Sequence, residues 1–204
     1  MRTATRLLAV SIAAVAGLAG LDVAAEQPAT DTTAPYLVNA RLNFRVTYPR
    51  FLRFRVGTTG AAVNHLVFNV PAAGVGNSAP VSATSGGDAG VSALNIEVVG
   101  NNGQVTITPT NSSGGQGIGT GTAADGRINY NQIQTTSSLP QLPPPVLSNA
   151  GGTPVQPTLN SALVTQRTAV WTYSYLNQTI PSAGTYGGTT AARGGRVTYT
   201  ATMP

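Results

Sequence analysis

Side chains that could carry acid–base or nucleophilic chemistry are scarce in this chain of 204 residues, which has one histidine, His65, and no cysteine. A serine hydrolase needs a base beside its nucleophile, and no Gly-x-Ser-x-Gly turn accompanies His65. The parity of His65 is opposite to that of Leu66 and Phe68, so we expect its side chain to face solvent. The absence of cysteine excludes thiol redox chemistry and cysteine-based zinc sites.

The acidic side chains are too dispersed to predict a paired-carboxylate or calcium site. Outside the first 25 residues the acids are Glu26, Asp31, Asp88, Glu97 and Asp125. Asp88 and Asp125 lie beside glycine in sequence typical of turns, and the acid-rich loop spacing of calcium sites is missing. We therefore expect no catalytic residue, no metal site and no cofactor.

The basic residues, all of them arginine, are the more informative charges. Arg41, Arg45, Arg53 and Arg55 occupy odd-numbered positions, opposite an apolar even-numbered face. This stripe offers a contact for an anion or an anionic glycan, because guanidinium groups bind phosphate and carboxylate in a fixed fork. A solvated strand face, on which charge discourages edge pairing, is the simpler interpretation. Nucleic acid is disfavoured as a partner, since no nucleic-acid-binding motif is present.

Aromatic residues gather toward the C-terminus, where Trp171, Tyr173 and Tyr175 share one parity. They alternate with Thr172 and Ser174, as the core-facing side chains of a strand do. A platform for stacking sugars is the alternative. The alternation favours a core position for this set, with the single tryptophan as core filler.

The elements that position these residues read as β-strands. Apolar and aromatic residues take every second position from residue 36 to residue 48, which predicts one long half-buried strand. Pro49 interrupts it, and the same parity resumes over residues 52–56. The alternating set is Tyr36, Val38, Ala40, Leu42, Phe44, Val46 and Tyr48.

Further alternating runs predict an all-β domain over residues 36–204, a single β-sandwich of immunoglobulin-like or jelly-roll topology. The Gly100-Asn101-Asn102-Gly103 stretch predicts a hairpin between two of these strands. Residues 111–122 are glycine-rich and residues 139–158 proline-rich, so we expect a mobile loop and an extended excursion without strand pairing. The remaining strands are expected at residues 63–70, 91–99, 104–108, 127–134, 164–176 and 196–202.

The first 25 residues have the three parts of a signal peptide. Arg2 and Arg6 precede an apolar run over residues 7–21, and Val23-Ala24-Ala25 fits the peptidase that would cleave before Glu26. Residues 26–35 are polar and are expected to form a flexible leader. We therefore expect an exported protein of the periplasm, cell surface or extracellular space, without a stable membrane span after processing.

The C-terminal sequence carries a resemblance to known proteins. Residues 180–186 read Ile-Pro-Ser-Ala-Gly-Thr-Tyr, and after a glycine-rich turn residues 196–202 alternate as Arg-Val-Thr-Tyr-Thr-Ala-Thr. This pattern resembles exported bacterial pilin-like and spore-coat-U-like β-sandwich proteins, in which an Ala-Gly-x-Tyr corner precedes a terminal strand. The chain departs from many pilins in lacking their disulfide.

The resemblance implies assembly into surface fibres, in which each subunit donates a strand to its neighbour. The polar leader lacks the side chains of a donor strand, so residues 36–48 are the better candidate. An internal strand of the same domain is the other interpretation of that segment. The strand-pairing surface would be formed by Tyr36, Val38, Leu42, Phe44 and Val46.

Three functions follow from these patterns. The first is a non-enzymatic exported structural protein, a fimbria-like or pilus-like fibre subunit that associates with itself or with other fibre subunits. The second is a secreted or periplasmic module that binds a glycan or an anion through the arginine stripe. The third, a hydrolase, rests only on the availability of serine and acidic residues.

Overall fold

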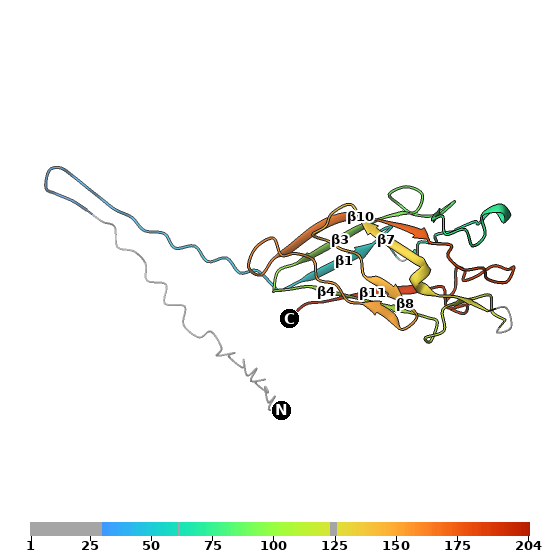
Figure 1. Ribbon diagram of the computed structural model, residues 1–204. Coiled ribbons are helices and arrows are strands. Elements are labelled where there is room, and N and C mark those ends of the chain that lie inside the picture. Colours follow the sequence, from blue (N-terminus) through green and yellow to red (C-terminus); the bar gives the residue numbers. More distant parts are fainter. Residues whose placement is uncertain (1–29, 61, 123–125) are drawn as a thin grey trace, which may run out of the picture. The chain divides into compact units, whose positions relative to one another are not determined.

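The computed structural model describes residues 30–60, 62–122 and 126–204 (Figure 1). The chain divides into two units, residues 1–47 and residues 48–204. The predicted signal peptide and residues 26–29 of the predicted leader lie outside the described residues. In the rest of that leader, the Asp31 carboxylate accepts the backbone N–H of Thr33 and of Leu37, each at 2.9 Å.

Strands dominate the second unit, so the all-β class is confirmed. In the described part of the chain, helix is limited to the three-residue turns η1 (Ala72–Gly74) and η3 (Tyr130–Gln132). The strands are β1 (Leu52–Val56), β2 (Val81–Ser82), β3 (Ala93–Gly100), β4 (Thr106–Asn111), β5 (Ile118–Gly119), β6 (Arg127–Ile128), β7 (Ile133–Ser137), β8 (Val146–Ser148), β9 (Gly151–Thr153), β10 (Thr165–Tyr175) and β11 (Val197–Thr202).

All of these strands pair antiparallel, in several sheets. The largest sheet has the order β1-β3-β10-β2, and β7 pairs with the C-terminal half of β10. The eleven-residue β10 is its central strand, pairing with β3 from Thr165 to Thr172. The other sheets are the pairs β4–β11, β5–β6 and β8–β9. Figure 1 shows β1, β3 and β10 on one side of this unit and β4, β8 and β11 on the other.

The core lies between these two groups of strands. Trp171 is fully buried, its indole Nε1 donates to the carbonyl oxygen of Leu142 at 3.1 Å, and its ring meets Tyr199 edge-on at 5.5 Å. Tyr173 and Tyr175 are also buried. The core position predicted for these three aromatic residues is therefore correct.

The proline-rich excursion contributes more than the sequence suggested. Residues 139–158 were expected to form no ladder, yet they contain the paired strands β8 and β9. Leu142 is fully buried, and Val155 exchanges two backbone hydrogen bonds with Ile107 of β4. The prolines leave enough free N–H groups between them for short ladders, because each removes only its own donor.

The predicted hairpin at residues 100–103 is wrong. β3 pairs with β1 and β10, whereas β4 pairs with β11 in another sheet, so these four residues carry the chain from one sheet to the other. The side chains of Asn101 and Asn102 bind main-chain groups of other segments here. Asn and Gly tolerate a tight change of direction, and this property serves a crossover between sheets as well as a hairpin.

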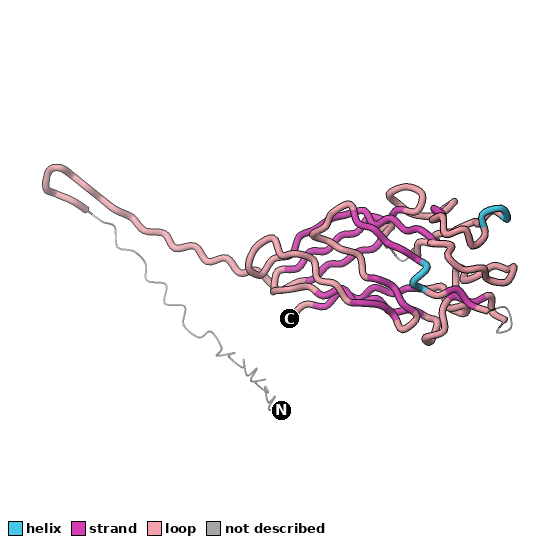
Figure 2. The backbone as a smooth tube through the Cα atoms, in the orientation of Figure 1, coloured by secondary structure: helices cyan, strands magenta, loops and turns pink. Residues whose placement is uncertain are grey.

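Two other predicted strands are absent. Residues 36–48 form no strand, and residues 63–70 form only an isolated bridge between Val67 and Ser85 (Figure 2). The β-rich unit therefore begins at Tyr48, later than the predicted boundary at Tyr36. Alternation of apolar residues requires a buried partner surface, and the sequence pattern alone does not say which chain provides it.

Candidate functional site

One edge of the largest sheet, formed by β1, has no strand beside it in the described chain. The backbone N–H of Gly57 donates to the carbonyl oxygen of Asn95 at 2.7 Å, which sets the alternation of hydrogen-bonded pairs along β1 and β3. The N–H and C=O groups of Leu52, Phe54 and Val56 therefore point away from β3. The side chains of these residues pack against the core cluster.

The edge of β11 is open in the same way. The N–H of Ser112 donates to the carbonyl oxygen of Arg196 at 3.0 Å, so the next hydrogen-bonded pair joins Thr198 to Thr110. The alternate residues Val197, Tyr199 and Ala201 direct their N–H and C=O groups away from β4. In agreement, Tyr199 lies opposite Pro109, which has no N–H to give.

The two open edges run in opposite directions. A Cβ atom placed on Gly100 would lie 3.4 Å from Leu52, the first residue of β1, and 2.9 Å from Met203, which follows the last residue of β11. The start of one edge thus lies at the end of the other. A strand added between them would be parallel to one edge and antiparallel to the other.

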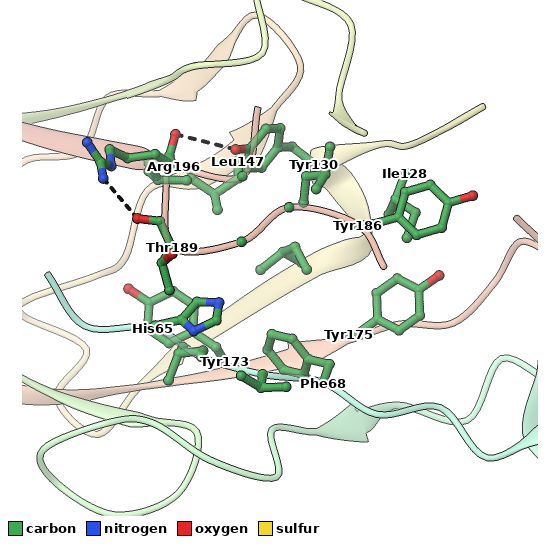
Figure 3. A pocket seen from close by; sticks show the side chains of 18 of the residues that line it. His65, Phe68, Ile128, Tyr130, Leu147, Tyr173, Tyr175, Tyr186, Thr189 and Arg196 are labelled. Carbon is green, nitrogen blue, oxygen red and sulfur yellow. Dashed lines mark hydrogen bonds between the residues drawn. The ribbon is translucent and has the colours of Figure 1, made fainter. Parts of the chain in front are cut away.

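A cavity of about 970 Å³ lies beside these edges, because Phe54 and Val56 of β1 and Val197 and Tyr199 of β11 belong to its lining. Figure 3 shows other side chains that line it, among them Phe68, Tyr173 and Tyr175. We call this cavity the groove. Residues 62–70 continue the β1 border, and residues 181–189 continue the β11 border. Aromatic and aliphatic side chains from both sheets line it, among them Phe54, Val56, Leu66, Phe68, Leu94, Ile128, Tyr130, Ile133, Leu147, Tyr173, Tyr175, Val197 and Tyr199.

The polar groups of the groove are mostly neutral. Burial raises the pKa of Tyr130 to about 12, with a smaller contribution from Tyr199. Burial also raises the pKa of Tyr199 to about 12 and that of Tyr173 well above its usual value. Asp and Glu are absent from the described residues that line the groove, and its cationic member Arg196 donates to the carbonyl oxygen of Thr189 at 3.1 Å.

The hydroxyl of Tyr130 anchors the border of the groove that contains β11. It donates to the carbonyl oxygen of Gly194 and lies 3.4 Å from that of Arg196, as Figure 3 shows for the second of these. Tyr130 itself is buried. The sequence placed Tyr130 within a strand but carried no signal for this contact, because Gly194 is 64 residues away.

The apolar side chains of residues 36–48 are exposed. Phe44 is 85% exposed, Leu42 76% and Val46 72%. In a half-buried strand these even-numbered side chains would be buried. The segment therefore does not form the predicted internal strand. Tyr36 and Val38 are exposed as well.

The four arginines of the predicted stripe do not share one strand. Arg53 and Arg55 lie on β1, where the Glu97 carboxylate of β3 is 2.6 Å from Arg53 and 3.6 Å from Arg55. Arg41 and Arg45 belong to the exposed segment in the first unit. The Glu97 carboxylate therefore offsets one of the two positive charges that lie on β1.

The other candidate residues that the structure describes show no arrangement for catalysis, and Glu26 and Asp125 lie outside the described residues. His65 is exposed, as its parity predicts, and lies at the border of the groove. Asp88 accepts the backbone N–H of Asn95 at 2.8 Å, which fits its predicted place in a turn. The described residues contain no group of three His, Cys, Asp or Glu side chains able to hold a metal ion.

Within the described ranges, no helix has the length and apolar character needed to cross a membrane. No family model, no curated protein and no solved structure matches the chain.

Proposed function

We propose that this protein is a non-enzymatic structural subunit of a surface fibre, and that subunits join when residues 36–48 of one copy enter the groove of the next. One observation carries the proposal. The same chain has a segment outside any strand, with exposed alternating apolar side chains, and a groove bordered by two strand edges that no other strand of the described residues covers. The exposed side chains lack an apolar surface that covers them, and the groove lacks a strand that pairs with its edges.

On this proposal the β-rich unit is a β-sandwich that lacks one strand, of immunoglobulin-like or jelly-roll type. The five-stranded sheet and the β4–β11 pair would be its two layers, with β1 and β11 at the open side. Sheet edges left unpaired are templates for strand addition. A donated strand would close this side and bury the groove.

The chemistry of the two surfaces is complementary. In an extended strand the even-numbered side chains from Tyr36 to Tyr48 point to one face, where they can fill the apolar groove. The odd-numbered Arg41 and Arg45 then face solvent. Burying one large apolar side chain contributes about 1.5–3 kcal/mol, so four or five of them supply on the order of 10 kcal/mol before the costs of association.

Two sequence features support an exported fibre protein. The first 25 residues have the parts of a signal peptide. The terminal pattern that resembles pilin-like and spore-coat-U-like proteins also has the hydrogen bond of a tyrosine corner, since the Tyr186 hydroxyl donates to the carbonyl oxygen of Ser182 at 2.9 Å.

Size-exclusion chromatography and electron microscopy of the protein from expressing cells test the proposal. We expect a ladder of oligomers or filaments that survives dilution. A synthetic peptide of residues 34–48 added during refolding should compete for the groove and leave capped monomers. A strictly monomeric protein, with no filaments on the cells and no binding of the peptide, would contradict the proposal.

A further inference from the structure

The side chain of Asn101 binds main-chain groups on both sides of Arg50. Its Oδ1 accepts the N–H of Phe51 at 2.9 Å, and its Nδ2 donates to the carbonyl oxygen of Pro49 at 2.8 Å. These residues connect residues 36–48 to β1. All of the atoms involved belong to the second unit of the chain.

This contact extends β1 toward its N-terminus. The register of β1 and β3 pairs Leu52 with Gly100, so its continuation would place Phe51 opposite Asn101. The main chain, however, leaves the sheet after Gly100 and crosses toward β4. The Asn101 amide takes the place of the missing backbone partner. The Pro49 carbonyl and the Phe51 N–H both point to this amide, as they would point to one side of an extended strand.

An extended conformation at Pro49 restricts how residues 36–48 could return to the groove of their own subunit. A return along β1 is a hairpin, and opposite residues of a hairpin share a face. The even-numbered side chains of residues 36–48 would therefore reach the face of Phe54 only if the loop of this hairpin contained an odd number of residues. Each three-residue loop that starts at residue 47, 48 or 49 contains Pro49, whose carbonyl oxygen Asn101 holds.

A loop that ends before Pro49 avoids this contact, but it prevents Phe44 and Val46 from lying opposite β1. A loop over residues 46–48 would place Phe44 opposite Arg50, before β1 begins at Leu52. Val46 would lie within the loop itself. A neighbouring subunit faces no such limit, since its segment is not tied to the β1 that it pairs with.

The adjacent Asn102 holds the other border of the groove at the same end. Its Nδ2 donates to the carbonyl oxygen of Pro204 at 2.6 Å, and its N–H contacts the Met203 sulfur at 3.3 Å. The crossover between β3 and β4 therefore fixes the start of β1 and the end of β11 together. A reversing chain would have to displace both contacts to enter between them.

We propose that Asn101 directs residues 36–48 to a second copy of the chain by preventing their insertion into their own groove. This inference rests on the proposed strand donation, and it adds a reason why the donated strand enters a neighbouring subunit. Loss of the Asn101 contacts should let the hairpin form, so that a subunit completes itself and assembly stops.

Photo-cross-linking of the full chain distinguishes insertion into a neighbouring subunit from insertion into the same subunit. A benzophenone amino acid replaces Phe44 in the wild-type, Asn101→Ala and Asn101→Asp backgrounds, and cross-linked products are separated on denaturing gels and mapped by mass spectrometry. We expect intermolecular ladders in the wild type. Asn101→Ala should raise the intramolecular product several-fold, and Asn101→Asp, which retains the acceptor for Phe51, should raise it less.

Asn160→Ala is the matched control, because Asn160 also accepts a main-chain N–H, that of Gln166 at 2.6 Å, but does not line the groove. Circular dichroism confirms that each variant folds. Unchanged ladders in a folded Asn101→Ala protein would overturn the role of Asn101 and leave strand donation standing. The absence of any cross-link to groove residues in the wild type would overturn both.

Discussion

The hydroxyl oxygens of Tyr173 and Tyr199 lie 3.3 Å apart and join β10 of the largest sheet to β11 of the other. Both residues line the groove, so this hydrogen bond spans the layers where the proposed strand position is open. Their raised pKa values come first from burial, which favours the neutral hydroxyl. The hydrogen bond persists while at least one of the two hydroxyls keeps its proton, because a phenolate still accepts from a neighbouring hydroxyl.

Stability should fall in alkaline solution. A group whose pKa is raised in the folded state contributes stability below its unfolded pKa, about 10, and loses it as the pH rises toward the folded value. For Tyr130 and Tyr199 that window runs from about pH 10 to about 12. Urea unfolding at pH 8, 10 and 11.5 should show a declining midpoint. The unfolding midpoint of a Tyr199→Phe protein should fall less than that of the wild type over this range. An equal fall would contradict the assignment of this alkaline loss of stability to Tyr199.

Removal of the Phe44 ring should weaken assembly. Phe44 is exposed and would enter the groove, where burying a phenyl ring contributes up to about 3 kcal/mol. Phe44→Ala should therefore weaken the association of subunits by about 100-fold, measured by sedimentation or by peptide competition. Asn43→Ala is the matched control, since its side chain has the opposite parity. Equal losses in the two variants would contradict insertion with even-numbered side chains inward.

Proline at two neighbouring positions of β11 should separate folding from assembly. The Ala201 N–H points away from β4, so Ala201→Pro should leave the fold intact but remove a donor that the incoming strand needs. The Thr200 N–H points toward Thr108, so Thr200→Pro should lower the thermal midpoint of unfolding. A folded Ala201→Pro protein that still assembles as the wild type does would show that the β11 edge receives no strand.

Neutralising Glu97 tests the arginine stripe. Arg53 is largely exposed, so its ion pair with Glu97 is screened by solvent, and Glu97→Gln should cost less than about 1 kcal/mol of stability. The same change frees Arg53 and Arg55 for anions. Tighter binding to a heparin column than the wild type shows would support the anion-binding alternative, whereas unchanged elution would count against it.

The sequence by itself determined the all-β class of fold and most of the longer strands. Alternation of apolar residues predicted β1, β3, β4, β10 and β11 and placed Trp171 in the core, but it missed β8 and β9. It also marked the even-numbered side chains of residues 36–48 as a surface that needs a partner. These properties are local, because the period of two belongs to the strand itself.

Only the tertiary structure decided which strands are neighbours and which edges remain open. The crossover at Asn101 and Asn102 reads as a hairpin in sequence, yet the pairing of β3 with β10 and of β4 with β11 joins residues far apart in the chain. The hydrogen bonds of an edge go to whichever strand lies beside it. A local sequence pattern does not identify this neighbouring strand. The groove between β1 and β11 is therefore a property of the folded chain.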